Sequence, residues 1–267
     1  MVTLKSPREI DAMRRSGKIT SSVLTELMKA VRPGISTGDL DAIAERGIRQ
    51  AGGVPTFKGY NGFPASICVS IDDEVVHGIP GSRVLRDGEL LSIDIGTTLD
   101  GYVSDSAATV PVGSVSEDAR RLMRVTQECL TIGIQQMEPG KHLGDIGAAV
   151  QEHAERHGYG VVRELVGHGV GRAMHEDPQV PNYGEWGTGL ELRAGLVLAI
   201  EPMITQASPK VRVLPDGWTV VTADGKLAAH FEHTIAVTEN GPRILTLRDY
   251  AEDPATERYR PAREAIA

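Results

Sequence analysis

Apolar and polar residues alternate with a helical period near the start of the chain. Over residues 10–27 the apolar positions recur every three or four residues. Ser6-Pro7-Arg8-Glu9 is a capping-box sequence with proline at the first helical position, so we predict a first helix from about residue 7 toward Pro33. A second helix is predicted after Thr37-Gly38-Asp39, ending near Gly52-Gly53.

Beyond the second helix the pattern changes to short apolar runs, which predict strands. The first strands are predicted at residues 66–71, 89–95 and 102–112, with a turn at Asp72-Asp73. Ser114-Val115-Ser116-Glu117 opens a long helix, and a shorter helix follows from about 143 to 157. The later predicted strands cover residues 161–165, 195–201, 210–214, 217–222 and 229–238. Each half of the chain therefore contains two helices followed by strands.

Several segments of the first half recur in the second half, about 106 residues later. The matched pairs are residues 33–40 with 139–146, the strand ending in Asp94 with the strand ending in Glu201, and residues 105–110 with 232–237. A period of this length is too long for a solenoid repeat. We therefore predict two halves, about 5–112 and 113–248, that are related by a pseudo-twofold axis and share one site.

These halves are predicted to form a single domain over residues 1–248. Residues 249–267 contain Pro254, Pro261 and many charges, and we predict that they form a surface extension. The composition, with 40% hydrophobic and 24% charged residues among 267, is ordinary for a soluble globular protein.

Net charge and cysteine content exclude some classes of function. The formal charge of −8 provides no basic face for general nucleic-acid binding. The sequence shows no cationic and then apolar leader and no long apolar span, so we expect a cytoplasmic protein without membrane insertion. Cys68 and Cys129 are too few and too far apart for a disulfide framework or a CxxC metal site, which fits a reducing compartment.

Four acids and one histidine stand in short apolar or glycine-rich settings that would present them inward. They are Asp94, Asp105, His168, Glu201 and Glu232. Any one of these acids could merely cap a turn, but several unpaired acids converging in one core would repel each other at a cost that cations would offset. Mostly oxygen donors with one nitrogen suit two divalent ions of the Mn, Fe, Co or Zn type. Two such ions can acidify a water held between them and polarise a carbonyl.

The motifs around these residues resemble those of type I methionine aminopeptidases. The matching segments are residues 75–80, 92–94, 102–105, 167–171, 175–178, 199–202 and 231–234. They occur in the family's order, and the resemblance covers roughly residues 5–248, in the short bacterial form without an N-terminal zinc finger. It implies the α/β (α+β) pita-bread fold, in which two halves with antiparallel sheet and covering helices close around a dinuclear metal site. The five residues above would be its ligands.

The resemblance also implies roles for residues around the metals. Glu201 would be the general base, His175 would hydrogen-bond the developing oxyanion, and His77 would contact the amide nitrogen or help to protonate the leaving amine. The pocket for the methionine side chain would be formed by Tyr60, Phe63, Cys68 and Trp218. Three positions, Phe57, Met174 and Gly96, depart from the family pattern or vary within it. The remaining histidines are interpreted as structural or solvated: His142, His153, His157, His230 and His233.

The activity implied by this resemblance is removal of the N-terminal methionine from nascent proteins whose second residue is small. Two alternatives remain open at this point. Prolidases and proline aminopeptidases share the fold and the metal ligands, although they usually carry a much longer N-terminal domain. A non-catalytic pita-bread binding protein would be favoured if ligands were missing, and none is. The expected partners are nascent polypeptide N-termini, with transient ribosome contact, for a monomeric enzyme that does not bind nucleic acid directly.

Overall fold

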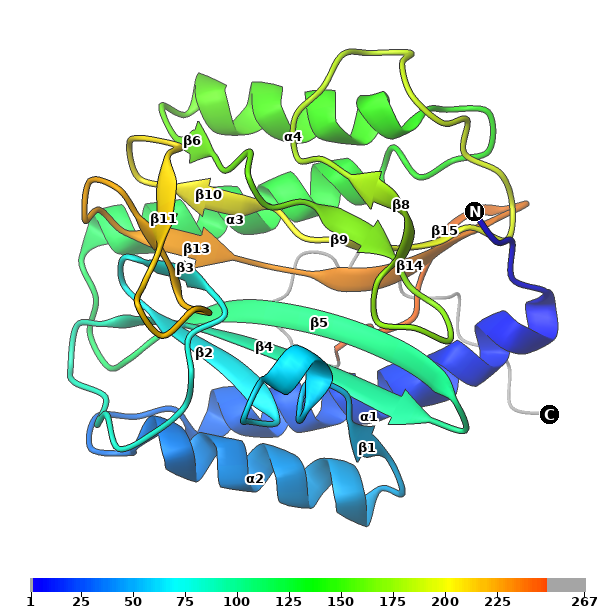
Figure 1. Ribbon diagram of the computed structural model, residues 1–267. Coiled ribbons are helices and arrows are strands. Elements are labelled where there is room, and N and C mark those ends of the chain that lie inside the picture. The colour runs from blue at the N-terminus through cyan, green and yellow to red at the C-terminus, as the bar shows by residue number, and fades with distance from the viewer. Residues whose placement is uncertain (1, 249–267) are drawn as a thin grey trace, which may run out of the picture.

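The protein is built in layers, with two helices on each outer face and the sheets between them (Figure 1). The computed structural model describes residues 2–248, so the extension predicted at 249–267 lies outside the described residues. Helices α1 (Pro7–Ala30) and α2 (Thr37–Gln50) cover one face, and α3 (Glu117–Ile134) and α4 (Leu143–Arg156) cover the other. No helix in residues 2–248 is long and apolar enough to cross a membrane.

All four helices lie close to where the sequence pattern predicted them, and the first two begin with capping boxes. Ser6 accepts a hydrogen bond from the Glu9 backbone N–H, and the Glu9 carboxylate accepts one from the Ser6 N–H. The same reciprocal pair links Ser36 and Asp39 at the start of α2. Such boxes satisfy backbone donors that would otherwise lack partners and so fix where each helix begins.

The first-half sheet is antiparallel and carries two of the predicted ligands. Its strands are β1 (Val54–Pro55), β4 (Leu90–Leu99), β2 (Ile67–Ile71) and β5 (Tyr102–Pro111), with β4 pairing all three others. The strand predicted at residues 89–95 instead continues to Leu99, because it pairs with β5 along its whole length. Asp94 faces Ala107 and Gly96 faces Asp105 across this pair, so the two acids are diagonal neighbours on one face.

The second half contributes a five-stranded sheet, one whole three-stranded sheet and two strands of another. The five strands, in spatial order, are β15 (Gly241–Ile244), β14 (His233–Thr238), β9 (Val197–Ile200), β7 (Gly167–Gly169) and β8 (Glu176–Val180). The first three-stranded sheet contains β13 (Ala228–His230), β10 (Met203–Thr205) and β6 (Gly160–Val161). The second contains β11 (Val211–Val213), β12 (Val220–Thr222) and β3 (Glu74–Val76), so it joins the two halves.

Some strand predictions were wrong in extent. The strand predicted at 229–238 is broken at Phe231 and Glu232, which separate β13 from β14. The strand predicted at 217–222 begins only at Val220, because the Asp216 carboxylate accepts hydrogen bonds from the backbone N–H groups of Trp218 and Thr219 and holds a turn there. The strand predicted at 161–165 is reduced to the two residues of β6. The sequence pattern also missed the short 3-10 helix η1 (Tyr60–Gly62).

The two halves meet along the segments that resemble each other in sequence. The Glu232 N–H donates to the Ala107 carbonyl at 2.9 Å, and the Asp105 N–H donates to Thr234 Oγ1 at 2.9 Å. The Ser106 hydroxyl donates to the Glu232 carbonyl at 2.8 Å. These bonds hold the backbone on both sides of two predicted ligands, so the ligand positions are set by contact between the halves rather than by a loop.

Candidate metal centre and substrate cavity

One cavity of about 300 Å³ lies between the two halves, and every residue predicted for the site lines it. Asp94 and Asp105 enter it from β4 and β5, and His168 enters it from β7. Glu201 follows the end of β9, and Glu232 lies in the break between β13 and β14. The structure therefore brings together five side chains that are far apart in the sequence. Their individual roles stay predictions.

The donor atoms of these residues lie close to one another. His168 Nε2 is 4.0 Å from Asp105 Oδ2 and 3.5 Å from Glu201 Oε1. One ligand atom from each of Asp105, His168 and Glu232 lies within 4.8 Å of the other two. Such spacing allows several carboxylate oxygens and one imidazole nitrogen to contact a shared metal centre after small side-chain adjustments.

The four acids bury oxygens without partners. Asp94 Oδ1, Asp105 Oδ1, Glu201 Oε1 and Glu232 Oε1 are each inaccessible to solvent and have no hydrogen-bond partner among residues 2–248. A buried carboxylate oxygen without a partner costs free energy, and four at one point need a compensating group. Divalent cations supply that compensation, and the oxygen-rich donor set matches their preference. The residues present therefore fit the metal centre that the sequence predicted.

Electrostatics at the centre lead to the same conclusion. Burial raises the pKa of Asp94 to about 7, and burial together with the charge of Glu232 raises the pKa of Asp105 well above its usual range. Burial and the charge of Asp105 raise the pKa of Glu201 well above normal, and burial and the charge of Glu201 do the same for Glu232. The protein alone thus disfavours the charged forms of these acids, and a bound cation would offset that cost.

His168 is oriented as a ligand by its own backbone. Its Nδ1 lies 2.9 Å from the Gly169 carbonyl oxygen and donates to it, which leaves Nε2 toward the acids. Burial lowers the pKa of His168 to about 4, so the imidazole is neutral at physiological pH, as metal binding requires. The flanking Gly167 and Gly169 cannot carry side chains, because a Cβ at either position would collide with a backbone carbonyl oxygen, that of Ala199 or Asp177.

The two histidines predicted to act on substrate border the same cavity. The His175 ring lies 4.2 Å from the His168 ring, centroid to centroid, and its Nδ1 is 2.8 Å from the Tyr60 hydroxyl. His77 follows β3 with a left-handed backbone (φ 62°), which turns the chain away from the strand. Burial lowers the pKa of both imidazoles, that of His77 to about 4. Both histidines can therefore act as neutral hydrogen-bonding groups.

Aromatic and sulfur-containing side chains form the apolar wall. Phe63 and Trp218 meet edge to face with ring centroids 5.1 Å apart, and the Cys68 side chain belongs to the same apolar cluster. Phe57 and Met174, the two departures from the family pattern, line the cavity as well. A wall of this kind can hold a linear thioether by dispersion and by sulfur–aromatic contacts.

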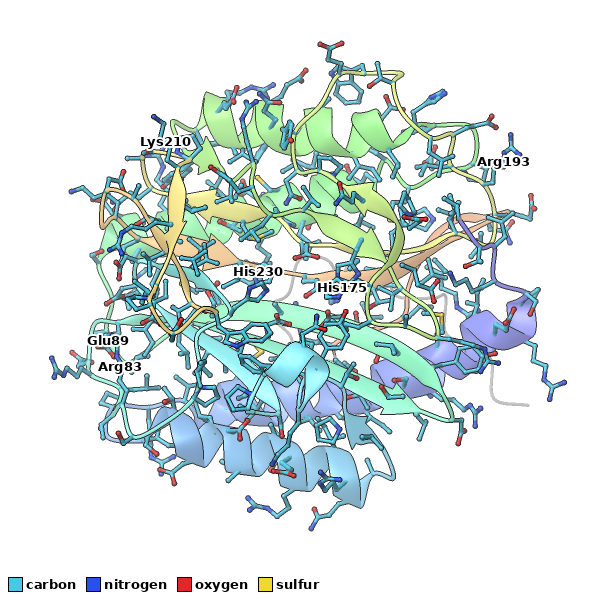
Figure 2. The ribbon with its side chains drawn as sticks, in the orientation of Figure 1. Arg83, Glu89, His175, Arg193, Lys210 and His230 are labelled. Carbon is cyan, nitrogen blue, oxygen red and sulfur yellow. The ribbon has the colours of Figure 1, made fainter. Side chains whose placement is uncertain are left out.

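His230, which the sequence analysis interpreted as structural or solvated, lies next to the predicted ligand Glu201 without lining the cavity. It is buried near the middle of the molecule (Figure 2). Its Nε2 lies 3.8 Å from Glu201 Oε2. Burial lowers its pKa to about 3. His230 stands only two residues before Glu232, and this nearness in sequence was a signal that could have identified it.

The model of metallopeptidase family M24 matches residues 11–239. The chain belongs to this family. A methionine aminopeptidase from Bacillus subtilis is 55% identical over 246 residues, covering 92% of this chain and 99% of the relative. The crystal structure of a methionine aminopeptidase from Thermotoga maritima superposes with a TM-score of 0.91 at 45% identity, covering 92% of this chain and 99% of that one.

Prolidases of family M24 are more distant. A prolidase from Pyrococcus horikoshii superposes with a TM-score of 0.73 at 22% identity, and it matches 93% of this chain but 64% of its own. At that identity the likeness shows the shared fold alone. The predicted resemblance, the pita-bread fold, the enzyme class and the choice of methionine removal over the prolidase alternative are confirmed.

Proposed function

We propose that this M24 enzyme cleaves the first peptide bond of polypeptides that begin with methionine and have a small second residue. The observation that carries the proposal is the cavity, which combines five metal-type donors with an apolar wall of Phe63, Cys68 and Trp218. The methionine aminopeptidases found at about half identity support the choice of substrate.

The metal centre would hold two divalent ions, with Asp94, Asp105, His168, Glu201 and Glu232 as ligands. When bound, the ions would lower the pKa of a water and polarise the scissile carbonyl. Cobalt, manganese, iron and zinc all suit this donor set, since carboxylates and imidazole accept each of them. The orphaned carboxylate oxygens and their raised pKa values support the presence of cations.

The residues of the chain would divide the proton transfers among them. Glu201, at the cavity wall, accepts the proton of the attacking water. His175, held at Nδ1 by the Tyr60 hydroxyl, presents Nε2 to the oxygen that gains charge in the tetrahedral transition state. His77, which also lines the cavity, would contact the amide nitrogen as it leaves. His230, with Nε2 3.8 Å from Glu201 Oε2, would limit where that carboxylate can move.

Specificity for methionine would come from the closed apolar pocket around its side chain. A methionine side chain fills the space bounded by Tyr60, Phe63, Cys68 and Trp218, where no hydrogen bond is needed. With the side chain seated there and the first peptide bond beside the acids, little of the cavity of about 300 Å³ is left for the second residue. Nascent polypeptide N-termini are the proposed substrates. Ribosome contact, a monomeric state and a cytoplasmic location stay predictions.

The proposal is tested by a peptide comparison. Metal-free protein is reconstituted separately with each of the four metals and given Met-Ala-Ser, Ala-Pro and Xaa-Pro peptides in parallel. Release of methionine from Met-Ala-Ser alone supports the proposal. Preferential cleavage before proline would establish the prolidase alternative, and no cleavage with any metal would favour a binding protein.

A further inference from the structure

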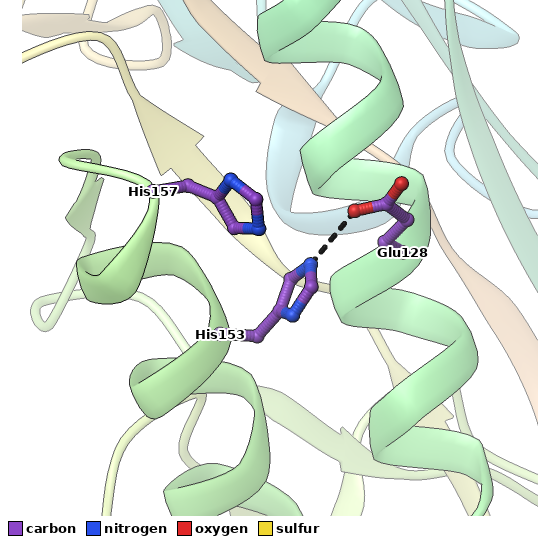
Figure 3. A group of neighbouring side chains, drawn as sticks. All are labelled: Glu128, His153 and His157. Atoms are coloured by element: carbon purple, nitrogen blue, oxygen red, sulfur yellow. Dashed lines mark hydrogen bonds and ion pairs between the residues drawn. The ribbon is translucent and has the colours of Figure 1, made fainter.

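A second group of potential metal ligands lies on the outer helical layer, away from the cavity. His153 is in the last turn of α4, His157 caps the end of that helix, and Glu128 lies on the neighbouring helix α3 (Figure 3). None of the three lines the cavity, and none has a part in the proposed function. The two helices pack against each other and against the sheet of β13, β10 and β6.

The three side chains converge from both helices. His153 and His157 are four residues apart and therefore share one face of α4, with ring centroids 4.7 Å apart. His153 Nε2 lies 2.8 Å from Glu128 Oε2. One donor atom from each of the three residues lies within 4.8 Å of the other two. In a tetrahedral zinc site the ligand atoms would be about 3.4 Å apart, which small side-chain rotations can reach.

We propose that Glu128, His153 and His157 form a binding site for a divalent ion of the zinc type. Two neutral imidazoles and one carboxylate are a common set of three zinc ligands, and a water would complete the tetrahedron. The ion would take the place of the hydrogen bond between His153 Nε2 and Glu128 Oε2, with both atoms turned toward it as ligands. It would fasten the end of α4 to the middle of α3.

The end of helix α4 favours a cation at this point. The carbonyl groups at the end of α4 give that end a partial negative charge, and both histidines lie there. Arg121 of α3 donates to the His157 carbonyl at 3.2 Å, which fixes the backbone of one ligand. The side chains are partly shielded rather than fully exposed, with 16% of His153 and 38% of Glu128 accessible. An ion can enter, and the ligands are held near one another before it does.

The test measures zinc per chain in the full-length protein after dialysis against a fixed concentration of free zinc. The variants are His153→Gln and His157→Gln, with His142→Gln, at the opposite end of α4, as the matched control. Wild type and the three variants should bind the same amount of zinc in the central cavity. Wild type and control should hold one more zinc per chain than the two site variants, while methionine release stays equal in all. Equal zinc content in the four proteins would overturn the proposal.

A second measurement locates the ion and does not depend on any variant. Crystals soaked in zinc salt should give an anomalous diffraction peak between Glu128, His153 and His157 in addition to peaks in the cavity. Peaks in the cavity alone would show that the three side chains form only a hydrogen-bonded surface group. Glu128→Gln should keep the site but weaken zinc binding by about tenfold or more, because a neutral amide is a poorer ligand.

Discussion

The ring of Phe57 occupies the space that a side chain at position 96 would need. A Cβ built on Gly96 would lie 2.6 Å from Phe57 Cε1 and 3.1 Å from Cδ1. Two positions that the sequence analysis singled out separately are therefore one structural unit. Gly96 faces Asp105 across the strand pair, and Phe57 lines the cavity, so the unit links the apolar wall to the metal ligands.

Gly96→Ala should therefore push the Phe57 ring into the cavity. Overpacking of this kind costs about 1–3 kcal/mol, so we expect lower stability in urea unfolding and a higher KM for Met-Ala-Ser. Phe57→Ala in the same chain should remove most of the added cost, as a double-mutant cycle would measure. Gly81→Ala is the matched control, because a Cβ there meets nothing within 4 Å. If Gly96→Ala lowered stability by the same amount with and without the Phe57 ring, the contact between the two positions would be contradicted.

Asp94→Asn should stabilise the metal-free protein at neutral pH. The pKa of Asp94 is about 7 in the folded state against 3.8 for the ordinary side chain. Between these values the unfolded chain binds fewer protons, so this group lowers the stability of the folded protein as pH rises from about 4 to about 7. The substitution removes that loss, on the order of 2–4 kcal/mol above about pH 7.

The measurement is urea unfolding of metal-free wild type and Asp94→Asn across that pH range. The stability gap should be small near pH 4 and widen toward pH 7, while metal uptake by the variant falls. Asp100→Asn is the control, because Asp100 lies in the exposed turn just after β4, the strand that contains Asp94. Its stability gap to wild type should not widen with pH. A gap that is constant with pH would mean that Asp94 is not a proton-holding acid in the metal-free protein.

His77→Ala and His175→Ala should slow turnover without removing metal. Both side chains border the cavity but are placed outside the ligand set, so kcat should fall by roughly 10²–10⁴-fold while metal per chain stays near wild type. Tyr60→Phe removes only the 2.8 Å bond to His175 and should give a smaller loss in kcat. Parallel loss of metal from either histidine variant would make that residue a ligand and require a different site.

The size of the second residue of the substrate should limit the rate of cleavage. A Met-Xaa-Ser series should be cleaved quickly when Xaa is glycine, alanine or serine, more slowly when it is valine, and poorly when it is leucine or lysine. This chain begins Met1-Val2, so freshly expressed, untagged protein should show slow and partial loss of its own first residue by intact-mass analysis. Cleavage of Met-Leu or Met-Lys peptides as fast as Met-Ala would rule out steric gating.

Local patterns were sufficient to predict the helices, and the motifs were sufficient to predict which side chains meet in the cavity. Capping boxes such as Ser6 with Glu9 are local, so sequence shows them directly. The break at Glu232 was not visible, because residues 229–238 alternate like one strand and the interruption depends on contact with Ala107 of the other half. The extension of β4 past Asp94 likewise depends on its partner β5.

Two other contacts could not be predicted from the sequence because they also depend on tertiary structure. They are the contact of Phe57 with Gly96 and that of Glu128 with His153. Each joins residues on elements that touch only after folding. Periodicity describes one element at a time, and a single sequence contains no record of which faces meet. The internal repeat was the exception, since matched segments 105–110 and 232–237 predicted a shared site and contain residues that do lie side by side.

The most direct test of the whole account measures bound metal and methionine release together in Asp105→Ala and Glu232→Ala. These acids come from opposite halves and lie with His168 in one ligand group. We predict that each variant stays folded by circular dichroism, loses metal from the cavity and no longer releases methionine from Met-Ala-Ser. Full activity of either variant at low metal concentration would contradict the assignment of this centre.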